Sequence, residues 1–91
     1  LPMLVLPRQV DFLLLPGFSM LALCSAIEPL RLANQLLGVA HYAWRHRTAD
    51  GRPARSSSGM TVPADARADA SDPAGPPACL IVLGGFDPWP Q

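Results

Sequence analysis

Hydrophobic side chains follow three different patterns along this chain, and each pattern predicts a different element. Residues 10–15 and 79–83 are short, almost unbroken apolar runs, which are typical of strands covered on both faces of a parallel sheet. Residues 20–37 carry apolar side chains around most of a helix. Residues 42–48 alternate between polar and apolar, which predicts a half-exposed strand towards a sheet edge.

The helix has clear limits and one narrow polar stripe. Ser19 is a suitable N-cap, and Gly38 is placed where glycine ends a helix. The polar residues fall at spacings of three and four, on one side: Ser25, Glu28, Arg31 and Gln35. A helix that is apolar over the rest of its surface packs on more than one neighbour. One neighbour is the sheet, and the other is a second helix or a second subunit.

The remaining segments predict turns and loops. Pro16–Gly17 ends the first strand, and Asp50–Gly51 marks a turn. Residues 52–63 predict two short extended arms around a turn, and residues 64–77 predict a loop with at most one helical turn. The order of elements predicts an α/β fold in which the two apolar strands lie side by side and parallel. In that arrangement Leu13 lies close to Val82.

Sheets of this kind bind ligands beyond the carboxyl ends of their strands. The two predicted strands end in short glycine-containing segments, which define a candidate ligand site: Gly17, Phe18, Gly84, Gly85, Phe86 and Asp87. The carboxylate of Asp87 would suit a cationic group. The Gly84–Gly85 pair lacks the G-x-G-x-x-G pattern of a phosphate loop, so a strand end that needs special backbone angles is the competing interpretation.

Composition limits the possible functions. The 91 residues suffice for one small domain, and the 49% hydrophobic content excludes a disordered tail. The formal net charge is zero and every basic side chain is arginine, so the chain offers no electrostatic footprint for nucleic acid. No pattern indicates a cofactor.

A targeting segment is the first alternative to a globular fold. Residues 12–26 are strongly apolar, and residues 21–24 resemble a lipoprotein cleavage box. Asp11 at the start of this run and Pro16–Gly17 in its middle argue against a signal peptide. The run also falls short of the roughly 20 residues that span a membrane. We therefore expect a cytoplasmic protein without membrane contact.

The reactive side chains have structural interpretations. Cys24 and Cys79 fit neither a disulfide framework nor a metal site, and we expect both to be buried small hydrophobes. No cluster of ligating side chains predicts a metal. Glu28 could act as a general acid or base, but an ion pair with Arg31 is favoured. The serines at 56–58 predict a polar turn.

Three motifs then carry a family resemblance: EPLRLAN at 28–34, WRHRTADG at 44–51 and SSSG at 56–59. In this order they resemble the amino-terminal sensor domain of AraC-type transcription regulators, which is similar to PfpI-like proteins of the class I glutamine amidotransferase-like superfamily. The resemblance divides the chain into an extended lead-in (1–9), a partial sensor domain (10–88) and a tail (89–91).

The resemblance implies a flavodoxin-like parallel-sheet sandwich, of which this chain supplies the first strands and first helix. It implies a non-enzymatic homodimer that senses a small nitrogenous metabolite, such as a quaternary amine or an amino-acid derivative. It also implies that DNA is bound only by a carboxy-terminal pair of helix-turn-helix motifs, which this chain lacks.

Two alternatives remain at this stage. One is a PfpI-like hydrolase or hydratase that stops before its nucleophilic cysteine, although the position of the family's first-helix carboxylate corresponds here to Ala22 or to a residue one place away. The other is an interaction module built on the apolar helix. Under any of these readings the isolated chain should expose apolar surface at 80–83 and 20–37, and so be marginally stable, self-associate or be part of something longer.

Overall fold

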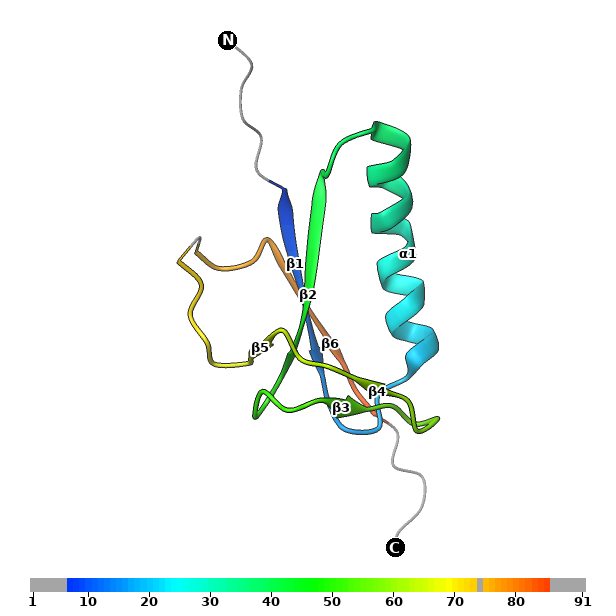
Figure 1. Cartoon of the computed structure of the whole chain (residues 1–91), viewed down its shortest axis with the longest axis vertical. Coiled ribbons are helices and arrows are strands. Elements are labelled where there is room, and N and C mark those ends of the chain that lie inside the picture. Colours follow the sequence, from blue (N-terminus) through cyan, green and yellow to red (C-terminus); the bar gives the residue numbers. More distant parts are fainter. Residues whose placement is uncertain (1–6, 74, 86–91) are drawn as a thin grey trace, which may run out of the picture.

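The computed structural model describes residues 7–73 and 75–85, which form a parallel sheet with one helix packed against it (Figure 1). The elements in chain order are β1 (Arg8–Leu14), α1 (Met20–Leu37), β2 (Tyr42–Thr48), β3 (Ala54–Arg55), β4 (Thr61–Val62), β5 (Ala66–Arg67) and β6 (Cys79–Leu83). The four-stranded sheet has the order β5-β2-β1-β6, and β3 and β4 form a separate antiparallel hairpin. The predicted α/β class is confirmed.

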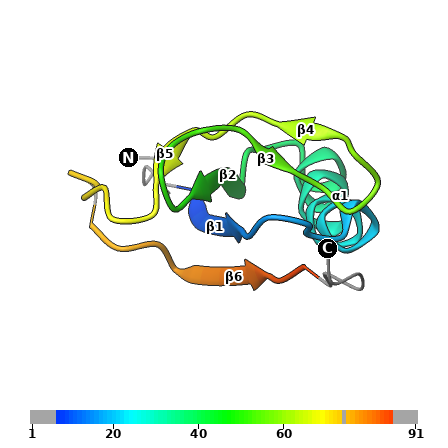
Figure 2. The same ribbon diagram turned by 90° about the horizontal axis from the view of Figure 1, so that it is seen from below.

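β1 is the central strand of the sheet. It pairs in parallel with β2 on one side and with β6 on the other, so that Phe12 lies between His46 and Ile81. Leu13 is the direct partner of Val82, which confirms the predicted adjacency of the two apolar strands. Figure 1 shows α1 running alongside β1 and β2, and Figure 2 shows it nearly end-on, to one side of the strands.

The predicted limits of α1 are confirmed. Ser19 has an extended backbone (φ −80°, ψ 118°), and its Oγ accepts a hydrogen bond of 3.1 Å from the N–H of Ala22. Gly38 is left-handed (φ 71°) and its N–H donates to the carbonyl of Asn34 at 2.9 Å. The side chain of Asn34 makes two hydrogen bonds of 2.9 Å to the backbone of Tyr42. This pair fixes the end of the helix to the start of β2.

The hydrophobic core lies between α1 and one face of the sheet. Its buried members are Val10, Phe12, Leu14, Phe18, Leu23 and Ala54. Leu23 is the buried residue of α1, and Ala54 belongs to the β3–β4 hairpin. The alternate residues of β1 therefore face α1, while Asp11 and Leu13 face the other side.

The prediction that β6 is fully buried was wrong. β6 is one of the two edge strands of the four-stranded sheet, and Leu80 and Val82 are more than half exposed. The apolar surface expected at 80–83 and on α1 is confirmed by these residues and by Leu21 and Leu36.

Both cysteines are exposed, so the prediction that they are buried was wrong. Cys24 lies on a flank of α1, about 100° around the helix from the buried Leu23, and Cys79 is the first residue of an edge strand.

The connection between β2 and β6 agrees with the sequence in part. The predicted turn at Gly51 has φ 77°, and the two predicted arms are β3 and β4. Within 64–73 and 75–77, however, there is no helical turn. Ala66 and Arg67 instead form β5, which pairs with the last residues of β2 and leaves β2 one strand in from the edge.

Candidate functional site

Three segments meet at the carboxyl edge of the sheet. The N–H of Leu15 donates to the carbonyl of Leu83 at 3.1 Å, which joins the ends of β1 and β6. The N–H of Gly17 donates to the carbonyl of Arg55 at 2.8 Å, and the N–H of Ser57 donates to the carbonyl of Phe18 at 2.8 Å. The β3–β4 hairpin is therefore bonded directly to the turn that follows β1.

The two predicted loops are in direct contact. Phe18 and Gly85 form an isolated antiparallel bridge. A Cβ on Gly85 would lie 2.6 Å from the carbonyl carbon of Gly17 and against the carbonyl oxygen of Pro16. Gly17 has a positive φ of 80°, whereas Gly84 and Gly85 do not have positive φ angles. Close backbone approach, rather than special backbone angles, is why a glycine occupies position 85.

The structure brings only some of the predicted site residues together. Gly17, Phe18 and Gly85 are brought together, and Gly84 is exposed beside them. The side chain of Phe18 is fully buried in the core, so this residue offers only its backbone to the edge. Phe86 and Asp87 lie outside the described residues.

For the serines at 56–58 of the β3–β4 hairpin, the sequence predicts only a polar turn. That turn is confirmed, because the buried Ser56 Oγ accepts from the N–H of Met60 at 3.0 Å and lies 3.0 Å from Ser58 Oγ. Its position against Gly17 also brings Arg55, a charged residue, to the carboxyl edge. Nothing local in the sequence signals this, because the contact joins segments far apart in the chain.

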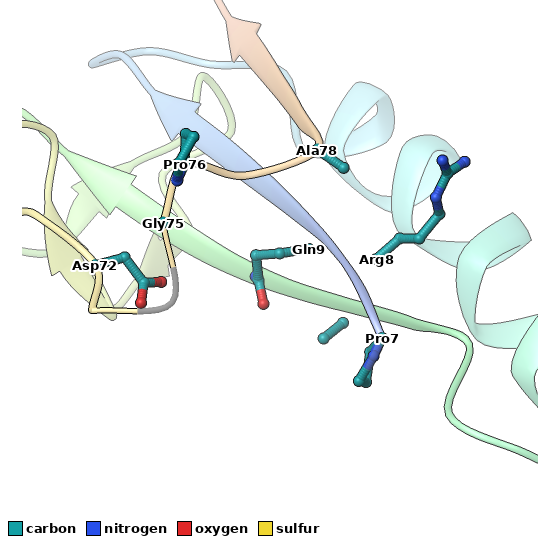
Figure 3. A pocket seen from close by; sticks show the side chains of 8 residues that line it. Pro7, Arg8, Gln9, Asp72, Gly75, Pro76 and Ala78 are labelled. Atoms are coloured by element: carbon teal, nitrogen blue, oxygen red, sulfur yellow. The ribbon is translucent and has the colours of Figure 1, made fainter. Parts of the chain in front are cut away.

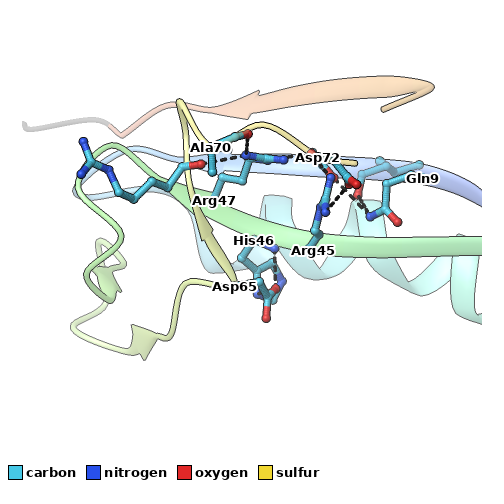
Figure 4. A network of polar contacts seen from close by, with 10 residues as sticks. Gln9, Arg45, His46, Arg47, Asp65, Ala70 and Asp72 are labelled. Carbon is cyan, nitrogen blue, oxygen red and sulfur yellow. Dashed lines mark hydrogen bonds and ion pairs between the residues drawn. The ribbon is translucent and has the colours of Figure 1, made fainter. Parts of the chain in front are cut away.

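The sheet face opposite α1 carries a buried ion-pair network (Figure 4). Asp11 is fully buried and accepts hydrogen bonds from Arg45 at 2.9 and 3.0 Å, from Arg47 at 2.7 Å and from Gln9 at 3.2 Å. Arg45 and Arg47 are alternate residues of β2, so both side chains point to the face on which Asp11 lies. In the sequence, Asp11 indicates only the start of an apolar run.

The network extends into the loop that follows β5. Arg45 Nη1 contacts Asp72 Oδ2 at 2.6 Å. Arg47 Nη1 donates to the carbonyls of Arg67 at 2.7 Å and Ala70 at 2.9 Å. Two arginines of β2 therefore hold the segment 67–72 over this face of the sheet.

The charges in this network stabilise one another. Burial alone raises the pKa of Asp11, but the hydrogen bonds from Arg45, Arg47 and Gln9 outweigh it and leave the pKa below its ordinary value. The hydrogen bonds that Arg45 donates to Asp11 raise the pKa of Arg45, with a further contribution from Asp72. Asp11 and Arg45 are thus both charged at neutral pH, and the geometry describes a structural network in which the carboxylate is fully occupied.

A second ion pair lies on the polar stripe of α1. Arg31 Nη2 and Glu28 Oε2 are 2.6 Å apart, and Arg31 also donates to Gln35 at 3.1 Å. The hydrogen bond from Arg31 lowers the pKa of Glu28. The predicted ion pair is confirmed, and both side chains are about half exposed.

A shallow depression of about 380 Å³ lies at the other end of the sheet (Figure 3). Its lining comes from the amino ends of β1 and β2 and from the segment before β6: Pro7, Arg8, Gln9, Ala43, Asp72, Gly75, Pro76 and Ala78. It opens on the face without a helix, where flavodoxin-like folds carry further helices. The depression therefore lies where further elements of such a fold would pack.

Two further properties concern the described residues alone. Within 7–73 and 75–85, no group of three or more His, Cys, Asp or Glu side chains is placed to hold a metal ion. No helix in the same residues is long and apolar enough to cross a membrane.

Comparison with known proteins adds the family. No protein-family model matches the chain. Over 81 residues, or 87% of the chain, it is 43% identical to the HTH-type transcriptional regulator GbdR of Pseudomonas aeruginosa, and over 77 residues, or 85%, it is 44% identical to the HTH-type transcriptional regulator CdhR of the same species. The crystal structure of an AraC family transcriptional regulator from Pseudomonas putida superposes with a TM-score of 0.76 and 32% identity, covering 89% of this chain and 49% of that one.

The chain is a homologue of the AraC-family transcriptional regulators. It spans only about a fifth of the length of the curated regulators that it matches (21% and 22%). The DJ-1 superfamily protein Atu0886 of Agrobacterium tumefaciens is also similar, with a TM-score of 0.57 and 28% identity over 86% of this chain and 38% of that one. The AraC-family resemblance and the partial flavodoxin-like fold are therefore confirmed together.

Proposed function

We propose that this chain forms part of the effector-sensing and dimerising domain of an AraC-family transcription regulator, which reaches DNA through a helix-turn-helix region outside this sequence. The observation that carries the proposal is the similarity to HTH-type regulators across 87% of the chain, on a fold shared with a solved AraC-family structure. A protein with this role acts in the cytoplasm.

The proposed effector site is the carboxyl edge, around Gly17, Phe18, Gly84 and Gly85. Three segments converge there, and Gly85 packs directly on the backbone of the turn at Gly17. A ligand that contacts both loops would alter how β1 and β6 end, and so the packing of whatever surrounds them. Phe86 and Asp87 follow directly in the sequence and complete the proposed site.

The proposed effector is a small nitrogenous metabolite, either a quaternary amine or an amino-acid derivative. In this proposal the carboxylate of Asp87 binds the cationic group. The backbone carbonyl of Arg55 accepts from the N–H of Gly17, and in this proposal the Arg55 side chain binds a carboxylate if the effector has one. A zwitterionic compound would use both charges.

Calorimetric titration of the full-length protein that contains this sequence tests the proposal. At least one compound among the quaternary amines and amino acids should release or absorb heat on binding. The substitution Asp87→Asn should weaken the binding of that compound. Asp69→Asn is the matched control, because Asp69 is an exposed carboxylate paired with Arg67 on β5. Absence of heat with every compound, together with measurable hydrolase activity, would contradict a sensor.

The similarity to a DJ-1 superfamily protein favours one second candidate, a PfpI-like hydrolase or hydratase. Such an enzyme needs a cysteine at a strand-to-helix turn, whereas Cys24 lies within α1 and Cys79 begins β6. Reading the gene beyond Gln91 separates the two candidates. A cysteine elbow without a helix-turn-helix pair would favour the enzyme.

A further inference from the structure

The outer edge of β2 carries backbone groups that point away from β1. The backbone N–H and C=O of successive residues in a strand point alternately to its two neighbours. Just before β2, the carbonyl of His41 accepts from the N–H of Arg8, so the odd-numbered residues of this segment face β1. The residues whose N–H and C=O groups point to the outer edge are therefore Tyr42, Trp44, His46 and Thr48.

This edge remains an edge when the sheet is extended. A flavodoxin-like sheet has the strand order 2-1-3-4-5, and β2, β1 and β6 take the first three places in that order. Later strands of such a fold add beside β6, on the opposite side of the sheet. An uncovered edge is a template on which a strand of another chain can pair. The outer edge of β2 therefore needs protection in the whole domain.

Two residues occupy this edge in the way that a neighbouring strand would. The side-chain amide of Asn34, in the last turn of α1, accepts from the N–H of Tyr42 and donates to the carbonyl of Tyr42, both at 2.9 Å. The carboxylate of Asp65 accepts from the N–H of His46 at 2.7 Å, and the N–H of Asp65 donates to the carbonyl of His46 at 2.8 Å. We call Asn34 and Asp65 the edge caps of β2.

The edge caps leave a gap of one residue. Beyond His46 the edge is covered by β5 and the residue after it, because the N–H of Ala68 donates to the carbonyl of Thr48 at 2.8 Å. In the part of the chain that the structure describes, the outward N–H and C=O of Trp44 have no partner. A strand that paired with Trp44 would have to displace the cap on one side of it or the other.

The outer edge of β6 lacks such caps. The N–H of Ala78 donates to the carbonyl of Gln9 on β1, so the outward backbone groups of β6 belong to Cys79 and Ile81. No side chain within 7–73 and 75–85 bonds to these groups. Caps are therefore present at the edge that an extended sheet leaves open, and absent at the edge on which it grows.

We propose that the edge caps of β2 prevent a strand of a second copy from pairing with this edge. The role is independent of effector and DNA binding. It differs from a purely structural one, in which Asn34 only joins α1 to β2 and the Asp65 carboxylate, 3.8 Å from His46 Nδ1, only supplies a charge. The two roles predict different behaviour when the caps are removed.

Sedimentation of the full-length protein over a range of concentrations tests the proposal. The double variant Asn34→Ala/Asp65→Ala should associate beyond the wild-type oligomer at least about tenfold more strongly, because the opened edge gains backbone hydrogen bonds to another copy. Leu23→Ala is the matched control, since it weakens the core and keeps both caps. At a temperature where circular dichroism shows every variant folded, this control should sediment like the wild type.

The single variant Asp65→Asn separates hydrogen bonding from charge. Its amide oxygen can still accept from the N–H of His46, so it should sediment like the wild type. Association of this variant would show that the charge is what matters, and would overturn the capping role of Asp65.

Residue-resolved amide exchange shows which edge pairs. In the wild type the N–H groups of Tyr42 and His46 should exchange slowly and that of Trp44 fast, whereas in the associated double variant Trp44 should become protected. A double variant that sediments like the wild type, equal association of Leu23→Ala, or a Trp44 amide that stays unprotected in the assembly would overturn the proposal.

Discussion

The two faces of the sheet bury adjacent residues of β1 in opposite ways. Phe12 is fully buried among apolar side chains beneath α1, and Asp11 is fully buried among two arginines on the other face. The first face excludes water by apolar packing, and the second replaces water by hydrogen bonds to every accessible lone pair of one carboxylate. Burial of a strand on both faces therefore does not require apolar residues on both.

The largest expected effect comes from the charged face. Asp11→Ala leaves Arg45 and Arg47 without their shared partner in a buried position, so we expect a loss of about 3–5 kcal/mol in the free energy of unfolding. Urea denaturation followed by tryptophan fluorescence measures it. Asp69→Ala removes a carboxylate from an exposed pair and should change the free energy by less than about 1 kcal/mol. Equal effects of the two substitutions would remove the distinction between the faces.

The apolar face should respond almost as strongly at its centre. Leu23→Ala opens a cavity where α1 meets the sheet, and we expect a loss of about 2–4 kcal/mol. Leu36→Ala on the outer side of the same helix should cost less than about 1 kcal/mol in the unfolding of a monomer. The same denaturation experiment at low protein concentration compares the two leucines.

The carboxyl edge, where both faces end, should be sensitive to a single methyl group. Gly85→Ala forces a Cβ against the backbone of Pro16 and Gly17, which cannot yield as a side chain can. We expect a loss of about 1–3 kcal/mol. Gly84→Ala is the matched control, because no atom lies within 4 Å of the position its Cβ would take.

The charged face should show a dependence on acid. The pKa of Asp11 in the folded protein lies below its ordinary value of 3.8. Its contribution to stability is therefore complete above about pH 4 and is lost as the pH falls through the folded pKa. Denaturation midpoints measured between pH 5 and pH 2.5 should fall more steeply for the wild type than for Asp11→Asn. Parallel profiles would argue against the network.

The smallest expected effect lies at the start of α1. Ser19→Ala removes the side chain that accepts from the N–H of Ala22, and a loss of about 1 kcal/mol is expected. Ser19→Asp should restore the cap. Ser71→Ala, at an exposed serine of the loop before β6, should have no measurable effect on the thermal midpoint.

The features that the sequence predicted correctly are those that depend on residues close together in the chain or on the order of the elements. The limits of α1 depend on Ser19 and Gly38, which act within one helical turn, and both were predicted correctly. The pairing of Leu13 with Val82 followed from two apolar runs with a helix between them, which is the order typical of a parallel sheet. These features need no knowledge of distant contacts.

The charged face could not be predicted in the same way. Asp11 and Arg45 are 34 residues apart, and they meet only because β1 and β2 pair in one particular register. The exposure of β6 was also missed, because an apolar run does not tell whether another strand lies beyond it. The same holds for the hairpin beside Gly17, whose position depends on the whole connection from β2.

Amide hydrogen exchange of the full-length protein, with and without a quaternary amine or amino-acid effector found by calorimetry, tests the central claim most directly. We predict that the effector slows exchange at the carboxyl edge, in peptides that contain Gly17, Phe18 and Gly84–Gly85. Protection confined to the opposite end, in peptides that contain Gln9, Ala43 and Ala78, would contradict the placement of the effector site.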